Sequence, residues 1–289
     1  MKFFKQLSLI TILLGTLTIH VEGQDLNLEN SLLWKIEKKH AKTSYLFGTI
    51  HMISEGDFFI SKHVEKAFRK SQALFMEIDI SNEEEMMSIM QYANMSDGKT
   101  LMDLLSPSDY ALLESTMREL TGIEMASLNS FKPFVLESFL IQNMIEGPIE
   151  SYEMTFAEMA KKDEIPILGL ESVKEQMALF DELPYQEQAK DLMTYVRGDE
   201  DMKKLFVEMV EMYKAQNITA LYNYMQSYFP NEKWMQKLLF DRNAKWISTL
   251  EENMAEQRIF IAVGAGHLGG EKGVIALLRN AGYEVTAAE

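Results

Sequence analysis

Two short stretches of this 289-residue chain place a glycine and a histidine at the same spacing. One reads GTIH at 48–51 and the other GAGH at 264–267, and each follows an apolar run. A neutral imidazole can bind a metal or carry a proton. Glycine lets a backbone turn sharply and approach a bound group. We predict that His51 and His267 share one site, with Gly48, Gly264 and Gly266 as motif glycines; the alternative is that each histidine is structural or solvated.

Two acidic residues stand at the ends of other short apolar runs. Glu77 follows ALFM, and Glu171 follows PILGL. Two imidazoles with one or two carboxylates suit a divalent metal such as Mn, Co, Zn or Fe, and the sequence does not choose among them. The chain has no cysteine, which excludes disulfides and thiolate ligands. A metal of this kind lowers the pKa of bound water to about 7 in favourable cases, and a further carboxylate can act as general base.

These side chains need strands that end at one edge of a sheet. Alternation over 32–37 and an apolar run at 45–47 predict a hairpin that ends in the first GxxH stretch, and 61–71 has the spacing of an amphipathic helix. Strands are predicted at 73–79, 165–171, 258–263 and 283–287, with a helix at 271–281. If the strands before both histidines run in the same direction, both imidazoles emerge at the edge where open α/β sheets bind ligands.

The middle of the chain reads as mostly helical. Ser106-Pro107 is a good helix start and Gly122 a plausible stop, with further helices at 131–146 and 151–162. Helices then run from 172 to about 256, broken near Pro184, Gly198 and Pro230. The predicted fold is α/β: a mixed central sheet built from both chain ends and flanked by helices, with a large helical insertion at about 82–256 that is interrupted by the strand near 165–171.

The first residues predict export. Two lysines precede the uncharged run LSLITILLGTLTI, and VEG follows with small residues where a signal peptidase reads. We predict a signal peptide at 1–23 and a single domain at 24–289, periplasmic or extracellular, without a stable membrane anchor after cleavage; the alternative is an uncleaved anchor. The formal net charge of -16 disfavours nucleic-acid partners. A peptide or a small molecule is the expected substrate, and the oligomeric state stays open.

Two other interpretations compete at these motifs. Residues 264–269 also match the dinucleotide pattern G-x-G-x-x-G, and Glu284 has the spacing of its ribose acid, but the chain ends before a second nucleotide-binding half. The chain has 21 methionines, several of them between 86 and 95. They favour adaptable packing or an apolar peptide groove over a copper site. His40 and His63 lie in charged surroundings and are expected at the surface.

The paired motifs, in order, resemble the TraB/GumN family. The resemblance covers about 32–285 and is carried by SLLWKIEKKHAKTSYLFGTIHMI, ALFMEIDI, PILGLESVKEQMALFDELP, LLFDRNAKWI and FIAVGAGHLGGEKGVIALLRNAGYEV. The family includes the Tiki proteins, which act as metal-dependent proteases on a secreted signalling protein, and its fold group is similar to erythromycin esterases and to a haem- or iron-binding lipoprotein family. The acid before the arginine of the RN stretch is Asp241 here, where the family often has Glu.

The resemblance implies roles for five residues. His51, His267, Glu77, Glu171 and Arg242 match family positions. Our hypothesis is an exported metal-dependent hydrolase of Tiki type. His51, His267 and Glu77 would hold the metal, Glu171 would act as base or further ligand, and Arg242 would orient carboxylates or support an oxyanion. The alternatives are a haem- or iron-binding envelope protein and a non-catalytic protein of envelope or polysaccharide assembly.

Overall fold

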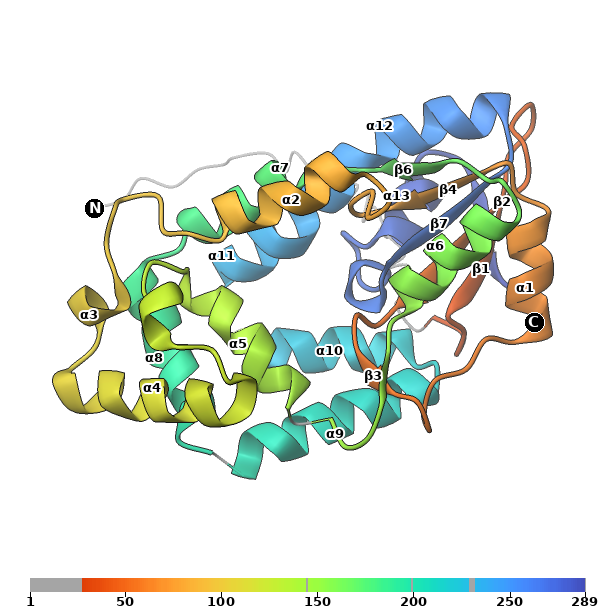
Figure 1. The fold of residues 1–289 in the computed structure, drawn as a ribbon. Helices are drawn as coiled ribbons and strands as arrows, with labels where there is room; N and C mark the ends of the chain where they lie inside the picture. Colours follow the sequence, from red (N-terminus) through yellow and green to blue (C-terminus); the bar gives the residue numbers. More distant parts are fainter. Residues whose placement is uncertain (1–27, 144, 199, 229–231, 289) are drawn as a thin grey trace, which may run out of the picture.

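The computed structural model describes residues 28–143, 145–198, 200–228 and 232–288 (Figure 1). The predicted signal peptide lies outside the described residues. Among the helices of the described part, none combines the length and the apolar character that a membrane crossing requires.

A six-stranded mixed sheet forms the centre of the fold, as predicted. Its strand order is β6-β4-β7-β2-β1-β8. The strands are β1 (Leu33–Glu37), β2 (Ser44–Thr49), β4 (Ala73–Met76), β6 (Ile167–Gly169), β7 (Ile259–Gly264) and β8 (Glu284–Ala287). β2, β7, β4 and β6 run parallel, while β1 is antiparallel to both β2 and β8. Both chain ends therefore contribute to one sheet.

The two strands that lead into the GxxH stretches are neighbours. β2 and β7 pair in parallel, with Gly48 opposite Val263 and Thr49 opposite Gly264. β4 lies on the other side of β7. β7 is buried along 259–263, which explains its continuous apolar sequence IFIAV. The expected common direction of these strands is confirmed.

Helices cover the sheet. On one face, Phe68 of α1 (Lys62–Arg69) and Phe156 of α6 (Tyr152–Lys162) pack on Phe260 of β7, with ring centroids 5.3 and 5.1 Å from it. Figure 1 shows α6 in front of the strands. α12 (Asp241–Glu256) and α13 (Val274–Asn280) pack together and add buried residues such as Trp246 and Leu278 to the same core.

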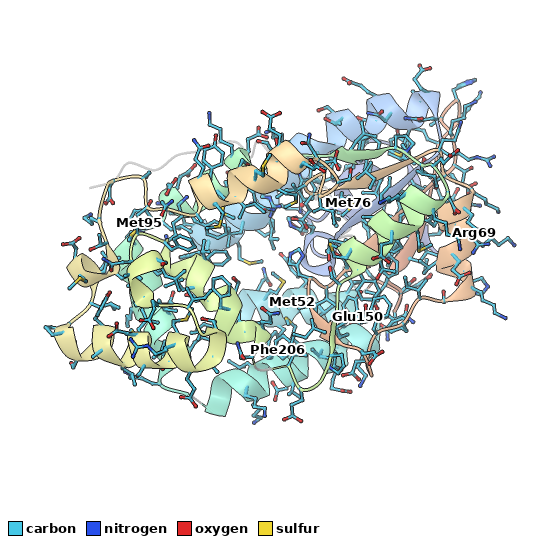
Figure 2. The ribbon with its side chains drawn as sticks, viewed as in Figure 1. Met52, Arg69, Met76, Met95, Glu150 and Phe206 are labelled. Carbon is cyan, nitrogen blue, oxygen red and sulfur yellow. The ribbon has the colours of Figure 1, made fainter. Side chains whose placement is uncertain are left out.

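The helical insertion has an apolar cluster of its own. This cluster includes Leu101, Leu136 and Leu192, and it lies on the left in Figure 1. In Figure 2, Met95 lies in this part of the molecule and Met76 in the sheet. The insertion and the segments that lead back to the sheet contain α2 (Glu83–Tyr92), α3 (Leu101–Leu104), α4 (Pro107–Thr121), α5 (Pro133–Gln142), α7 (Val173–Asp181), α8 (Tyr185–Val196), α9 (Glu200–Lys214), α10 (Ile218–Tyr228) and α11 (Glu232–Met235).

Several boundaries follow the sequence signals and others do not. Ser106 accepts a hydrogen bond from Asp109 N–H, and Gly122 ends α4 with φ 68°. The break between α9 and α10 was not predicted; Gln216 stands there with φ 54°. The last helix begins at Val274 rather than at 271, because Gly270, with φ 78°, first turns the chain. A small second sheet, β3 (Ile53–Ser54) with β5 (Ile149–Glu150), also lacked a sequence signal.

Candidate functional site

The predicted site residues gather at the carboxyl ends of the parallel strands. His51 lies two residues beyond β2, Glu77 directly follows β4, and Glu171 lies two residues beyond β6. His267 sits in a 3-10 turn, Ala265–His267, that follows β7 directly. Arg242 reaches this edge from the first turn of α12. Because all four strands run in the same direction, residues from five separate segments meet at one edge of the sheet.

Arg242 is the centre of the buried part of the site. Its side chain is 10% exposed. Nε donates to both oxygens of Glu171, at 2.9 and 3.1 Å, and Nη2 donates to Glu77 Oε2 at 2.6 Å and also to Glu171. Nη1 donates to the carbonyl oxygen of Leu238 at 2.8 Å and lies 3.2 Å from His267 Nε2. A guanidinium has five N–H donors, and all five have partners here. These contacts support an orienting role, whereas oxyanion support would require one of them to break.

Leu238 belongs to a π-helical segment, Gln236–Phe240, that leads directly into α12. Single π turns inside helices are frequent at functional sites. This segment aims its Leu238 carbonyl at Arg242 and so fixes the guanidinium between the two glutamates.

The tautomer of His267 follows from its neighbour Asn243. Asn243 Nδ2 donates to the carbonyl oxygens of His267 and Lys272, so its Oδ1 is the acceptor that faces His267 Nδ1 at 2.6 Å. His267 therefore carries its proton on Nδ1, and Nε2 presents a lone pair toward Arg242 and Glu77. Sequence reasoning did not select Asn243, although it directly follows Arg242 in the RN stretch.

The pKa of His267 is low for physical reasons. Burial of the ring, 5% exposed, together with the charges of Arg242 and His51, lowers the pKa of His267 to about 3, against the opposing charge of Glu77. The imidazole is therefore neutral at pH 7 and able to accept a hydrogen bond or bind a metal.

The two glutamates differ in their protonation. Burial alone would raise the pKa of Glu77, but the charges of His267 when protonated, Arg242 and His51 hold it well below its usual range. Gly264 N–H also donates to Glu77 Oε1 at 2.8 Å. Burial raises the pKa of Glu171, and the charge of Glu77 adds to that, against the pull of Arg242. Gln176 donates to both carboxylates at 3.2 Å, and it too was missed from the sequence.

His51 lies at the rim of the site and has a different partner. Its side chain is 69% exposed, and its Nδ1 lies 3.1 Å from Glu153 Oε1. Glu153 also accepts hydrogen bonds from the hydroxyls of Thr49 and Ser151, at 2.6 and 3.0 Å. Surrounding protein atoms oppose a charge on the ring, but the hydrogen bond and the charge of Glu153 raise the pKa of His51 to about 9. Glu153 sits in the first turn of α6, and no sequence signal marked it.

Replacing Glu153 with glutamine is expected to lower the pKa of His51 from about 9 toward the ordinary histidine value of about 6.5. The charge that stabilises the imidazolium is lost, whereas the amide can still contact the ring. An NMR titration of the His51 ring protons measures this shift. Glu158→Gln, an exposed glutamate on the same helix, is the control. An unchanged His51 titration in Glu153→Gln would show that Glu153 does not raise the pKa of His51.

The motif glycines stand at positions where a side chain would crowd its neighbours. A Cβ on Gly48 would lie 3.1 Å from the side chains of Ala265 and Leu268, where β2 meets the turn that carries His267. A Cβ on Gly264 would lie 3.3 Å from Glu77 Oε1, and one on Gly266 would lie 2.5 Å from Met225 Sδ. Gly48 and Gly264 therefore let the two histidine segments pack against each other and against Glu77, while Gly266 leaves room for Met225.

The donor set can be tested against a divalent metal. Nδ1 of His51 is held by Glu153 and Nδ1 of His267 by Asn243, so Nε2 would be the ligand atom of each ring. Most metal-binding histidines are oriented by a hydrogen bond of this kind at the other ring nitrogen. A metal would have to displace the proton on His51 Nε2 and the contact of Arg242 Nη1 with His267 Nε2. The oxygens of Glu77 and Glu171 are likewise engaged, by Arg242, Gln176 and Gly264 N–H. In the described part of the chain, no three His, Asp or Glu side chains are grouped to hold an ion, so the predicted ligand set stays a prediction.

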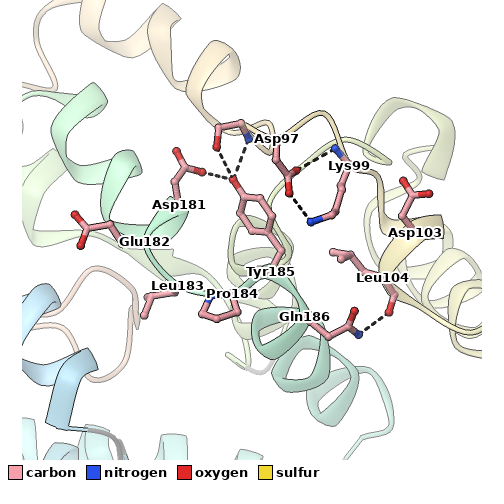
Figure 3. A pocket seen from close by; sticks show the side chains of 11 residues that line it. Asp97, Lys99, Asp103, Leu104, Asp181, Glu182, Leu183, Pro184, Tyr185 and Gln186 are labelled. Atoms are coloured by element: carbon pink, nitrogen blue, oxygen red, sulfur yellow. Dashed lines mark hydrogen bonds and ion pairs between the residues drawn. The ribbon is translucent and has the colours of Figure 1, made fainter.

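A polar pocket in the helical insertion is separate from this site. It has a volume of about 420 Å³, and none of the predicted site residues lines it. Figure 3 shows the Tyr185 hydroxyl beside Asp181, and this hydroxyl also lies 3.1 Å from the Ser96 hydroxyl. Asp97 pairs with Lys99 at 2.7 Å, and Asp181 pairs with the buried Lys132 at 3.0 Å. These polar groups form hydrogen bonds and ion pairs with one another. The residues predicted to bind a metal or transfer protons lie instead at the edge of the sheet.

Comparisons with known proteins identify relatives of this chain. The metalloprotease TIKI homolog of Nematostella vectensis is 24% identical over 89% of this chain and 66% of its own length, and metalloprotease TIKI1 of Danio rerio is 20% identical over 89% and 63%. The uncharacterized protein YbaP of Shigella flexneri is 26% identical over 82% of this chain and 88% of its own. The chain thus spans about two thirds of these TIKI relatives. No solved structure matches. The TraB/PrgY/gumN family model matches residues 32–287, and the chain belongs to this family.

Proposed function

We propose that this protein is an exported, metal-dependent hydrolase that cleaves peptide bonds. The observation that carries the proposal is the pairing of His51 and His267 at adjacent parallel strand ends, each with its Nδ1 held by a neighbouring side chain. The TIKI relatives are named as metalloproteases, which supports the reaction class.

In this proposal His51, His267 and Glu77 hold a divalent metal, which would activate water and polarise the scissile carbonyl. Glu171 serves as the proton-transfer group, because burial and the neighbouring Glu77 raise the pKa of its carboxyl. Arg242 keeps both carboxylates in place, and Asn243 keeps the His267 proton on Nδ1. Trp246 packs on the His267 ring, with centroids 4.6 Å apart, and shields it from water.

The test measures metal content and hydrolysis together. Purified protein is equilibrated in turn with Mn²⁺, Co²⁺, Zn²⁺ and Fe²⁺, and bound metal is measured by mass spectrometry. Hydrolysis is followed with fluorescein-labelled unfolded casein and a peptide library. His51→Ala and His267→Ala are each expected to weaken metal binding and hydrolysis by about 100-fold or more. Even residues that only hydrogen-bond to a metal ligand contribute about 10–100-fold. His63→Ala, an exposed histidine on α1, is the control and is expected to match the wild type.

The proposal fails if neither substitution at the paired motifs lowers metal content or hydrolysis. It also fails if the wild type binds metal yet cuts no peptide or casein under any metal condition.

A further inference from the structure

One edge of the central sheet lies beside the site. β6 is the last strand at that edge, with β4 as its single partner in the sheet. Two residues after β6 ends at Gly169, the chain reaches Glu171 in the site. Along β6, Leu168 is 38% exposed and Gly169 is exposed as well. The outer side of this strand is therefore accessible and continues directly into the site.

The hydrogen bonds of β6 show which backbone groups remain available. Leu74 N–H donates to the carbonyl of Pro166 at 2.9 Å, and Leu170 N–H donates to the carbonyl of Met76 at 2.8 Å. In a parallel pair, alternate residues face the neighbouring strand. Pro166, Leu168 and Leu170 thus face β4, while Ile167 and Gly169 direct their N–H and C=O groups outward. Among the described residues, none makes a hydrogen bond to these outward groups.

The opposite edge of the sheet is protected. β8 forms that edge, and its register with β1 directs Val285 outward. The guanidinium of Arg279 donates to the carbonyl of Val285, through Nε at 3.2 Å and Nη2 at 2.6 Å. Proteins commonly blunt exposed strand edges in this way, because unpaired edges bind other strands. The unblunted edge is the one that adjoins the site.

We infer that β6 binds an extended segment of the protein substrate as an added strand and delivers it to the site. An extended peptide carries N–H and C=O groups at alternate residues, which matches the outward groups of Ile167 and Gly169. Leu168 adds an apolar surface beside that segment. Because β6 leads into Glu171, the added segment leaves the sheet at the edge where Glu171 lies.

This inference rests on the proposed function and adds a substrate class to it. Backbone pairing needs several consecutive residues in extended conformation and reads little of their side chains. The substrates are therefore unfolded or terminal protein segments, and a dipeptide that spans only the scissile bond gains nothing from β6.

The test uses Ile167→Pro. Proline removes the outward N–H of residue 167 and projects its ring toward an incoming strand, while the ladder to β4 does not use that N–H. Hydrolysis is measured with fluorescein-labelled unfolded casein and with a fluorogenic blocked dipeptide of the residues that flank a casein cleavage site. Ala287→Pro, at an outward position on β8, is the matched control.

For casein, kcat/KM is expected to fall about tenfold in Ile167→Pro, through KM, because one or two hydrogen bonds and the strand contact are lost. Dipeptide hydrolysis is expected to stay within twofold of the wild type, and Ala287→Pro is expected to change neither. Unchanged casein hydrolysis in a folded Ile167→Pro would overturn the inference, as would an equal loss on both substrates.

Hydrogen exchange on the wild-type chain supplies a second measurement that needs no variant and no turnover. With chelator present, excess unfolded casein is expected to slow exchange of the Ile167 and Gly169 amides and to leave those of β8 unchanged. If the wild type hydrolyses nothing, the proposed function fails, and slowed exchange still supports the β6 edge. Exchange that casein does not slow, or that slows with protein concentration alone because two copies pair, overturns the inference.

Discussion

Arg242→Ala is expected to lower the free energy of unfolding by about 3–5 kcal/mol, because it leaves buried carboxylates without their cation. Glu77 and Glu171 are each 9% exposed, and Arg242 binds both. The loss also frees the Leu238 carbonyl and His267 Nε2 from their donor. Urea unfolding followed by circular dichroism at pH 7 measures the change.

Two further variants test whether the loss of stability comes from the unpaired buried carboxylates. Arg197→Ala breaks an exposed ion pair with Asp109, 2.6 Å long, and is expected to cost less than about 1 kcal/mol. Adding Glu77→Gln and Glu171→Gln to Arg242→Met removes all three charges and is expected to restore part of the stability that Arg242→Ala loses. A loss below about 1 kcal/mol in Arg242→Ala would contradict the central place given to this arginine.

The second large effect concerns acid stability of the metal-free protein. The folded-state pKa of His267 is about 3, while an unfolded histidine titrates near 6.5. Between these values the unfolded chain binds the proton and the folded chain does not. Stability from His267 is therefore present above pH 6.5 and lost as the pH falls toward 3, by on the order of 3–5 kcal/mol.

The measurement is the urea unfolding midpoint at pH 7, 6 and 5 with chelator present. Most carboxylates remain ionised in this range, and His51, whose pKa is raised, stays protonated in the folded state. The free energy of unfolding is expected to fall with pH more steeply in the wild type than in His267→Gln, which keeps a side chain able to accept from Arg242. Parallel pH profiles for the two proteins would show that His267 is not held neutral by the fold.

Much of the fold was predictable because the relevant signals are local. The hairpin of β1 and β2, the buried strands and the Ser106-Pro107 helix start each follow from composition and spacing within a few residues. The break at Gln216 was not predictable, because glutamine has no preference for positive φ and yet adopts a positive φ there. The same side chain accepts a hydrogen bond from Leu32 N–H at 3.2 Å, a contact across 184 residues.

The site was predictable as a set of residues and less so as a set of contacts. His51, Glu77, Glu171 and His267 could be selected because each follows a short apolar run that forms a strand, and Arg242 entered through the family resemblance. That Arg242 would occupy the space between the glutamates depends on the π-helical turn before it, which has no sequence signature. Glu153, Gln176 and Asn243 each act through a side-chain contact between separate segments, and spacing along the chain does not report such contacts.

The position of β7 has a consequence for biosynthesis. This strand lies between β2 and β4, yet it follows both of them by more than 180 residues along the chain. A growing polypeptide therefore carries the first motif for a long stretch of its synthesis without the strand that His267 follows. The long-range closure that joins β2 to β7 comes late and is entropically costly. The site is thus complete only after residue 267 has been synthesised, and a product that terminates before β7 lacks His267.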